Sequence, residues 1–418
     1  MPLSPLACGR LGMAGDWHEC ALGDVIELKR GYDLPQQERR PGAVPIVSSS
    51  GVTDYHAEAM ATGPGVVTGR YGTLGQVFYI EQGFWPLNTT LYVRNFKGND
   101  PRFISYFMRS LDFLAYSDKA AVPGVNRNHL HQARVVVPTD VGEQRAIAHI
   151  LGTLDDKIEL SRQMNETLEA MARTLFKSWF VDIDPVRAKA EGRDPGLPKP
   201  IADLFPDRLV DSDLGEIPEW WEVGKLGDVA EHPRRSEQPD TIEPDVPYIA
   251  LEHMPKRCIA LSDWGVAEGL ESNKFGFKKG EILFGKLRPY FHKVGVAPCD
   301  GVCSTDIVVV APQEPHWFAF VLGLISSDEF VEFTNAGSTG TKMPRTSWAD
   351  MARYELVKPP SPIAKAFTDL MRPSVERIIA GIHESRSLAL VRDALLPKLI
   401  SGELRVRDAE RIAAGVAA

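Results

Sequence analysis

The sequence predicts an α+β fold in which two similar β-rich domains are each followed by a long helix, and the two helices pair as an antiparallel coiled coil. The first observation is a repeat: Trp-His-Glu-Cys-Ala-Leu-Gly-Asp-Val at residues 17–25 returns as Trp-Glu-Val-Gly-Lys-Leu-Gly-Asp-Val at residues 221–229. The second is that each copy continues into short apolar runs separated by glycines and prolines, a pattern typical of short strands joined by tight turns. The third is that each copy closes with an apolar run, a proline and a long amphipathic segment.

Further stretches repeat in the same order, which supports a duplicated domain. They are, first copy before second, residues 44–47 and 246–249, residues 65–70 and 280–286, residues 88–90 and 304–306, and residues 133–138 and 354–359. The predicted segments are a leader at 1–15, a first β-rich domain at 16–141, a helix at 142–182, a Pro- and Gly-rich connector at 183–219, a second β-rich domain at 220–360, a second helix at 361–404 and a tail at 405–418.

The composition is that of an ordinary soluble protein, with 44% hydrophobic and 25% charged residues in a chain of 418. That length is sufficient for two or more domains, each with its own core. No apolar run reaches the length of a membrane span, and no secretory signal is evident, so we expect a cytoplasmic protein. The five scattered cysteines are expected to be reduced thiols, because Cys299 and Cys303 lack a second ligand pair with zinc-site spacing.

Two long helices are predicted from apolar residues on a coiled-coil repeat. The seam of the first consists of Ile147, Leu151, Leu154, Ile158, Leu168, Leu175 and Trp179, and Ser161 and Asn165 interrupt it. The seam of the second consists of Ile363, Phe367, Leu370, Ile378, Ile382, Leu388, Val391, Leu395 and Leu399. Pro373 and Pro397 should bend or interrupt this second helix. The alternative is that each helix packs on its own domain, but the unbroken length of the first favours helix pairing.

A shorter helix is predicted at residues 101–117 of the first domain. Its apolar face consists of Phe103, Ile104, Phe107, Leu111 and Leu114.

Motifs of familiar catalytic chemistry are missing together. The sequence has no Gly-x-Ser-x-Gly, His-Glu-x-x-His or Cys-x-x-Cys, and the Gly-rich residues 69–75 lack the Gly-Lys-Ser/Thr ending of a phosphate-binding loop. The isolated histidines, which we expect to be structural, are His56, His129, His131 and His292. The chain is therefore predicted to be non-catalytic.

Polar and basic residues on corresponding loops of the two copies form a candidate DNA-reading surface. Arginine and lysine pair with guanine, asparagine pairs with adenine, and small hydroxyls bind phosphates. The candidates are Arg70, Tyr71, Asn126, Arg127 and Asn128 in the first copy and Lys286, Arg288, Ser338, Thr339, Lys342 and Arg345 in the second. The alternative for each residue is ordinary loop polarity. The net charge of −9 gives no long-range basic footprint, so other subunits would have to neutralise much of the phosphate charge.

The helical segments resemble a known family. Gly-Glu-Gln-Arg-Ala-Ile-Ala-His-Ile-Leu at 142–151, Leu-Asp-Asp-Lys-Ile at 154–158 and Leu-Phe-Lys-Ser-Trp-Phe at 175–180 resemble the central conserved region of type I restriction-modification specificity subunits. Residues 202–209 and 214–218 resemble the lead-in to the second recognition domain of that family, and residues 396–402 resemble its carboxy-terminal close. One departure is that Pro362-Ile-Ala-Lys365 stands where the second helix would repeat the Glu-Gln pair.

This resemblance implies two target recognition domains that each read one half of a split site in double-stranded DNA, with the paired helices as spacer. It implies two methyltransferase (M) subunits and restriction (R) subunits as partners, with the seam residues Ile382, Leu388, Leu395 and Leu399 and those of the first helix serving pairing and docking. S-adenosylmethionine, ATP and Mg are expected in those partner subunits, with none in this chain. No membrane association is implied.

Two other hypotheses remain from the sequence. A coiled-coil adaptor that holds two protein partners without binding DNA would suit the acidic charge, and an enzyme with an unfamiliar site would act without partners. The copies differ most in the loops and strands between their shared pieces. If they read DNA, this divergence predicts two unlike half-sites and an asymmetric target.

Overall fold

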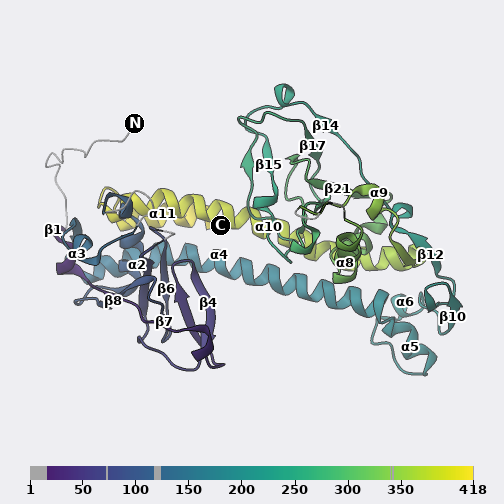
Figure 1. Cartoon of the computed structure of the whole chain (residues 1–418), viewed down its shortest axis with the longest axis horizontal. Helices are drawn as coiled ribbons and strands as arrows, with labels where there is room; N and C mark the ends of the chain where they lie inside the picture. Colours follow the sequence, from purple (N-terminus) through teal and green to yellow (C-terminus); the bar gives the residue numbers. More distant parts are fainter. Residues whose placement is uncertain (1–16, 72–73, 117–123, 339, 341–342, 418) are drawn as a thin grey trace. The chain divides into compact units, whose positions relative to one another are not determined.

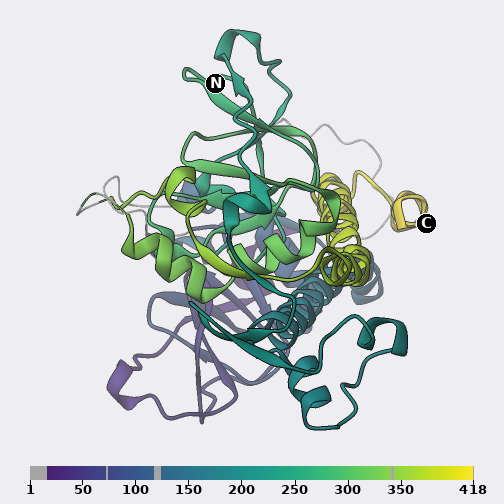
Figure 2. The same ribbon diagram turned by 90° about the vertical axis from the view of Figure 1, so that its right-hand side faces the viewer.

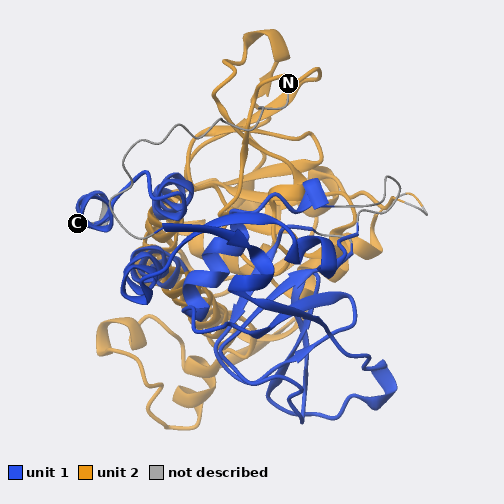
Figure 3. Ribbon diagram, turned by 90° about the vertical axis from the view of Figure 1, so that its left-hand side faces the viewer, with its two compact units in different colours: residues 1–158, 387–418 blue, residues 159–386 orange. Residues whose placement is uncertain are grey.

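The computed structural model describes residues 17–71, 74–116, 124–338, 340 and 343–417, and the chain forms two compact units (Figures 1 and 3). Unit 1 comprises residues 1–158 and 387–418, and unit 2 comprises residues 159–386. The leader at 1–15, Thr339 and Lys342 lie outside the described residues. None of the described helices has the length and apolar character needed to span a membrane.

Unit 1 contains a four-stranded antiparallel sheet, a three-stranded sheet and a two-stranded ribbon. The four-stranded sheet has the order β2 (Glu27–Arg30), β8 (Thr90–Asn95), β5 (Gly65–Gly69), β6 (Val77–Ile80). The three-stranded sheet has the order β4 (Gly51–His56), β3 (Val44–Ser48), β7 (Trp85–Pro86), and the ribbon pairs β1 (Trp17–Ala21) with β9 (Arg134–Pro138). Strands β3 and β7 are parallel, whereas all the other pairs are antiparallel.

Unit 2 repeats this plan with one larger sheet. Its four-stranded sheet has the order β13 (Ala230–Glu231), β21 (Ile307–Pro312), β18 (Ile282–Gly285), β19 (Val294–Val296). Its five-stranded sheet has the order β14 (Ser236–Glu237), β17 (Lys274–Phe277), β20 (Gly301–Cys303), β15 (Pro247–Ile249), β16 (Gly265–Val266), and its ribbon pairs β12 (Glu222–Lys225) with β22 (Glu355–Lys358). The parallel pair recurs as β15 with β20, so the duplication read from the sequence is a duplication of topology.

Strand register corrects one predicted correspondence by one residue. Gly69 pairs with Thr90 in unit 1, and Gly285 pairs with Ile307 in unit 2. Thr90 therefore corresponds to Ile307, and Thr89 corresponds to Asp306. The sequence pattern alone pairs residues 88–90 with 304–306, which is one residue out of this register.

The helix predicted at 101–117 is shorter in the structure, where α2 spans Pro101–Arg109 and a 3₁₀ turn follows at Phe113–Tyr116. The Asp112 carboxylate accepts a hydrogen bond from the Leu114 N–H at 3.0 Å, a local turn that competes with helix continuation. Leu114 is consequently 66% exposed, so its placement on the buried face was wrong. The remaining short helices of the β-rich parts are α1 (Leu22–Val25), α3 (Arg127–His131), α7 (Phe318–Ile325), α8 (Asp328–Ala336) and α9 (Trp348–Met351).

The two long helices are α4 (Val141–Phe176), continued by a π-helical turn at Lys177–Val181, and α10 (Ser361–Ile400). Pro373 and Pro397 were expected to bend or interrupt the second helix, but α10 continues through both without interruption. A proline inside a helix costs about 3 kcal/mol, but Met371 and Val375 on either side of Pro373 are buried in the core of unit 2. Packing of an apolar face, rather than local propensity, determines most helical stability in proteins.

The helices contact one another within each unit. In unit 1, the guanidinium of Arg392 on α10 binds the carboxylate of Asp155 on α4 at 2.6 Å. In unit 2, the Ser161 hydroxyl donates a hydrogen bond to the Gly381 carbonyl oxygen at 3.2 Å, and the rings of Phe176 and Phe367 lie 6.2 Å apart. Figure 2 shows α4 and α10 nearly end-on.

Most of the predicted seam residues are buried, which limits the part they can play in docking. Ile147, Leu151, Leu154, Leu388, Leu395 and Leu399 belong to the core of unit 1, and Trp179 belongs to that of unit 2. Ile382 packs with Ile378 and Ala260. Ile158, Leu168 and Leu175 are half-buried. A partner that docks on these helices would have to use another face.

The glutamine of the Glu-Gln pair ties α4 to its own domain. Gln144 is fully buried, its amide donates to the oxygens of Pro138 at 2.9 Å and Asn99 at 2.7 Å, and its carbonyl accepts from the Asp100 N–H at 2.9 Å. At the matching place on α10, Lys365 is exposed and pairs with Asp369. The second copy lacks the Glu-Gln pair, so α10 is not attached to its adjoining domain by a buried glutamine as α4 is.

The connector and the tail contain more structure than expected. The connector includes α5 (Asp184–Ala190), α6 (Lys199–Ala202) and a hairpin of β10 (Leu209–Ser212) and β11 (Gly215–Pro218), and its Phe205 packs edge-on against Trp179 at 5.1 Å. The tail forms α11 (Val406–Ala417), whose Ala409 is buried in the core of unit 1. These segments are short or lack a long apolar repeat, which is why periodicity missed them.

Candidate nucleic-acid interface

In unit 1, two polar loops are joined side by side at one end of the four-stranded sheet. Strand β5 leads into Arg70 and Tyr71, and the second loop leads into α3. Tyr71 forms an antiparallel bridge with Gly124, and the Val125 N–H donates a hydrogen bond to the Arg70 carbonyl oxygen at 3.0 Å. Backbone hydrogen bonding therefore fixes the two loops as one surface.

The small size of Gly124 permits this joint. A Cβ at this position would lie 2.6 Å from the Tyr71 ring, closer than side chains approach one another. The Arg70 guanidinium lies 4.7 Å from the centre of the same ring, a cation–π contact. Gly124, Tyr71 and Arg70 thus form a layered arrangement in which the cation is held against an aromatic face.

The rest of the unit 1 surface consists of hydrogen-bond donors around an open hollow. Asn126 caps α3, because its side-chain oxygen accepts from the Asn128 N–H at 3.0 Å, and Arg127 and Asn128 are exposed. Arg30, Arg70, Tyr71, Asn126 and Arg127 line a hollow of about 460 Å³. All five predicted residues of unit 1 therefore lie in or beside this joined pair of loops.

Unit 2 builds the same joint from different side chains. Leu287 bridges to Arg345, and the Thr346 N–H donates to the Lys286 carbonyl oxygen at 3.1 Å. The Arg288 N–H donates to the Pro344 carbonyl oxygen at 2.8 Å. Lys286 accordingly corresponds to Arg70, and Arg345 corresponds to Gly124.

Two positions differ from the expected matching of the second loops. Ser347, rather than a residue of 337–345, corresponds to Asn126, because Ser347 caps α9 by accepting from the Asp350 N–H at 3.3 Å. The Ser338 hydroxyl donates to the Asn335 carbonyl oxygen at 2.6 Å and so completes the end of α8. Thr339 and Lys342 cannot be placed, as they lie outside the described residues.

Arg288 has an unusual backbone. Its φ of 52° lies in the left-handed region, which costs a residue with a side chain about 1 kcal/mol or more. Its guanidinium lies 5.9 Å from the Phe291 ring centre. Arg288 adopts this conformation at the residue whose N–H bonds to Pro344 of the facing loop.

Sequence reasoning missed one arginine in each unit. Arg30 lines the hollow of unit 1, and Arg234 lies as far beyond Trp221 as Arg30 lies beyond Trp17. Burial lowers the pKa of His232, and the positive charges of Arg234 and Lys286 lower it further. The repeat could have indicated both arginines, because they occupy the same position of the two copies.

Three of the isolated histidines have structural hydrogen bonds. His131 accepts from the Leu28 N–H and His56 from the Arg40 N–H, both at 2.9 Å, and a ring nitrogen of His292 lies 3.0 Å from the Ser326 carbonyl oxygen. Across the described residues, no group of three or more His, Cys, Asp or Glu side chains could hold a metal ion. The described surface offers donors for base edges and phosphates in both units.

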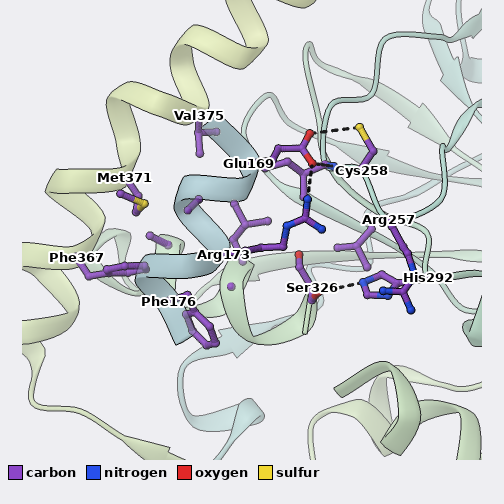
Figure 4. Close-up of a pocket in the computed structure, with 16 residues that line it drawn as sticks. Glu169, Arg173, Phe176, Arg257, Cys258, His292, Ser326, Phe367, Met371 and Val375 are labelled. Carbon is purple, nitrogen blue, oxygen red and sulfur yellow. Dashed lines mark hydrogen bonds and ion pairs between the residues drawn. The ribbon is translucent and has the colours of Figure 1, made fainter. Parts of the chain in front are cut away.

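A buried carboxylate attaches α4 to the β-rich part of unit 2 (Figure 4). Glu169 accepts hydrogen bonds from the N–H groups of Ile259 and Ala260, both at 3.1 Å, and from the Cys258 thiol at 3.3 Å. Burial and the charge of Glu169 raise the pKa of Cys258 to about 12, so this thiol stays protonated. The pocket beside it is lined mainly by apolar side chains of α4, α7 and α10.

Comparison with known proteins gives a consistent result. Residues 14–170 match the family described as the type I restriction modification DNA specificity domain. The chain is 28% identical over 429 residues to the specificity subunit of the type I restriction enzyme MjaIX of Methanocaldococcus jannaschii, covering 94% of each chain. It is 25% identical to the HindI specificity subunit of Haemophilus influenzae, covering 70% of this chain and 73% of that one. Over nearly its whole length, the chain is therefore similar to type I restriction enzyme specificity subunits, and its first repeat matches their DNA specificity domain.

A solved structure has a similar fold. The crystal structure of the specificity subunit from M. genitalium matches 93% of this chain and 97% of its own length, with a TM-score of 0.60 and 14% identity. The family match at residues 14–170 covers the first repeat and much of α4. Beyond the matched residues, unit 2 repeats the strand topology of unit 1.

Proposed function

We propose that this chain is the non-catalytic DNA sequence-specificity subunit of a type I restriction-modification complex. The observation that carries the proposal is the joint of two loops that recurs in both units, with Arg70 in one and Lys286 at the matching position of the other. A cation at the same position of the repeated loop joint suits two surfaces that each bind DNA. Different neighbouring side chains then suit two unlike half-sites.

The long helices are proposed to pair as an antiparallel coiled coil that separates the two recognition domains. The order of their contacts supports this pairing: Asp155 meets Arg392, whereas Phe176, later on α4, meets Phe367, earlier on α10. The 36 residues of α4 correspond to a length of about 54 Å. Helices of this length would keep the half-sites apart by a spacer that the chain does not read.

The partners are proposed to be two methyltransferase subunits and restriction subunits, which would bring S-adenosylmethionine, ATP and Mg. Leu160, Met164 and Met171 are exposed and share one face of α4, since residues four and seven apart lie on the same side of a helix. These side chains stay exposed although Ser161 and Phe176 of the same helix contact α10, and they suit an apolar partner surface. The acidic net charge also fits a subunit whose partners supply cations toward DNA.

The test is to map N6-methyladenine in the source genome with and without this chain. The proposal predicts a bipartite, asymmetric motif that loses methylation when the chain is removed and regains it when the chain is restored. Methylation that is unchanged by removal would contradict it. The alternative adaptor function predicts that the assembled complex binds specific and random duplexes equally.

A further inference from the structure

An acid–base pair in unit 2 occupies the place where unit 1 has two small residues. The Arg345 guanidinium lies 3.2 Å from the Asp306 carboxylate. The register and the bridges place Asp306 at the position of Thr89, and Arg345 at that of Gly124. The same loop joint therefore has a charged pair in unit 2 and two uncharged residues in unit 1.

Both residues of the pair extend from backbone that is fixed by hydrogen bonds. The Asp306 carbonyl oxygen accepts from the Lys286 N–H at 2.9 Å, and its own N–H donates to the Ser304 hydroxyl at 3.2 Å. Arg345 lies between two residues that bond to the facing loop, because Pro344 accepts from Arg288 and Thr346 donates to Lys286. The backbone on both sides of the pair is thus fixed, and the ion pair holds the two side chains against each other.

The pair remains accessible to a ligand. The Asp306 side chain is 27% exposed and that of Arg345 is 54% exposed. An ion pair with this exposure adds little to folding stability. A carboxylate repels DNA phosphates, so Asp306 weakens the attraction of Lys286 and Arg345 for DNA in general. A contact with a base would offset this repulsion at one sequence only.

Base edges supply the groups that such a pair can recognise. An arginine can donate two hydrogen bonds to the O6 and N7 atoms of guanine, and an aspartate can accept one from the N4 amino group of cytosine. A G·C pair presents these atoms side by side in the major groove. An ionised carboxylate has about four lone-pair sites, and Arg345 leaves room on it for an amino donor.

We propose that Asp306 and Arg345 are specificity-determining residues of unit 2 and that together they require a G·C pair in its half-site. Arg345 donates to the guanine, and Asp306 both orients the guanidinium and accepts from the cytosine amino group. The inference rests on the proposed DNA-reading function of this chain. It would also give the two domains different base preferences, because Gly124 has no side chain to donate to guanine and Thr89 has a neutral hydroxyl in place of the carboxylate.

The experiment selects DNA with the full chain assembled with its methyltransferase subunits. The complex is mixed with duplexes that carry randomised segments, and the bound fraction is sequenced at fixed salt. The variants are Asp306→Asn, Arg345→Ala and Arg345→Lys. The control is Asp328→Asn, which removes an exposed carboxylate of unit 2 that lies 2.7 Å from Arg257.

The wild-type complex is expected to select a bipartite motif. One half-site should contain an invariant G·C pair, and this should be the half-site that changes when residues 220–360 are replaced by another recognition domain. Each variant should lower the preference for that pair roughly tenfold and change the other positions less than twofold. Arg345→Lys should keep overall affinity but lose guanine preference, because lysine lacks the bidentate fork. The Asp328→Asn control should select the wild-type motif.

Two results would overturn the proposal in different ways. If the wild type selects a motif but the variants weaken all sequences equally or retain the same motif, the pair is structural and the inference fails alone. If the wild-type complex selects no motif, the proposed function fails as well. Thermal unfolding of each variant within a few degrees of the wild type excludes misfolding as the cause.

Discussion

The backbone N–H of Val125 donates a hydrogen bond to the carbonyl oxygen of Arg70 at 3.0 Å, and this contact joins the two loops of unit 1 into one surface. The contact between Thr346 and Lys286 in unit 2, at 3.1 Å, has the same place in the repeat. Because main-chain atoms make both contacts, the joint can be retained while the side chains around it change. This arrangement suits a protein that must present different base-reading side chains on one fold.

Replacement of Gly124 should weaken DNA binding by unit 1 without unfolding it. In Gly124→Ala the new Cβ would meet the Tyr71 ring at 2.6 Å, so the ring and the Arg70 cation against it must move. We expect a loss of affinity for the cognate duplex of about tenfold, equivalent to about 1.4 kcal/mol, measured by fluorescence anisotropy. Gly415→Ala is the matched control, since no atom lies within 4 Å of its added Cβ. Equal binding by the Gly124→Ala variant and the wild type would show that the ring position is irrelevant.

Removal of the Glu169 charge should destabilise unit 2. The carboxylate accepts from two backbone N–H groups and a thiol while almost fully buried. Glu169→Ala should lower the free energy of unfolding by about 2 to 3 kcal/mol, the usual range for buried hydrogen bonds to a charged group. Glu166→Gln, on the same helix but exposed, should cost less than about 1 kcal/mol. Chemical denaturation of both variants measures the difference, and similar losses would contradict the role of Glu169.

The interaction of Asp155 should depend on pH. Burial raises the pKa of Asp155, but hydrogen bonds from Tyr106 and Arg392 and the charge of Arg109 outweigh burial, so the net pKa is lowered. A carboxyl group whose folded pKa is below its unfolded value of about 3.9 stabilises the fold above that pH, and this contribution is lost as the pH falls through the folded pKa.

The prediction is that the stability difference between wild type and Asp155→Asn is largest near neutral pH and shrinks below about pH 4. Urea unfolding at a series of pH values measures it. Asp156→Asn, which removes a more exposed partner of Arg102, should show a smaller difference at every pH. A difference for Asp155→Asn that stays constant down to pH 2 would be inconsistent with this network.

Arg30 and Arg234 should contribute to DNA affinity through phosphate contacts. Replacing either one with alanine should weaken binding to all sequences and reduce the slope of log affinity against log salt by about 1. Arg193→Ala is the control, because Arg193 is an exposed connector residue paired with Glu191. Titrations at several salt concentrations test this. A change of base preference without a change of slope would instead assign these arginines to base contacts.

The sequence predicted the duplicated plan because Trp17 to Val25 and Trp221 to Val229 are long enough to align without a structure. The loops named from the sequence as a candidate surface are joined in each unit, and Arg70 and Lys286 occupy matching places in them. The sequence pattern misplaced Asp306 by one residue, since strand register depends on hydrogen-bond partners that a short polar stretch does not specify. Leu114 was misassigned because a local turn at Asp112 ended the helix.

Arg345 shows why the details of the site could not be read from the chain. Its partner Asp306 is distant in sequence, and its equivalent in unit 1 is a glycine, so neither composition nor the repeat indicated a charged pair. Pro373 was expected to bend or interrupt α10 from its local preference, but the helix is not interrupted, since Met371 and Val375 beside it pack in the core of unit 2. In each case a contact between distant residues decided the outcome.

The central claim is that each domain reads one half of the DNA site. The most direct measurement replaces residues 220–360 with the corresponding domain of another specificity subunit and maps N6-methyladenine across the genome of the resulting strain. The account predicts that one half of the methylated motif changes, while the other half and the spacer length are retained. A motif that stays unchanged, or that changes in both halves, would contradict it.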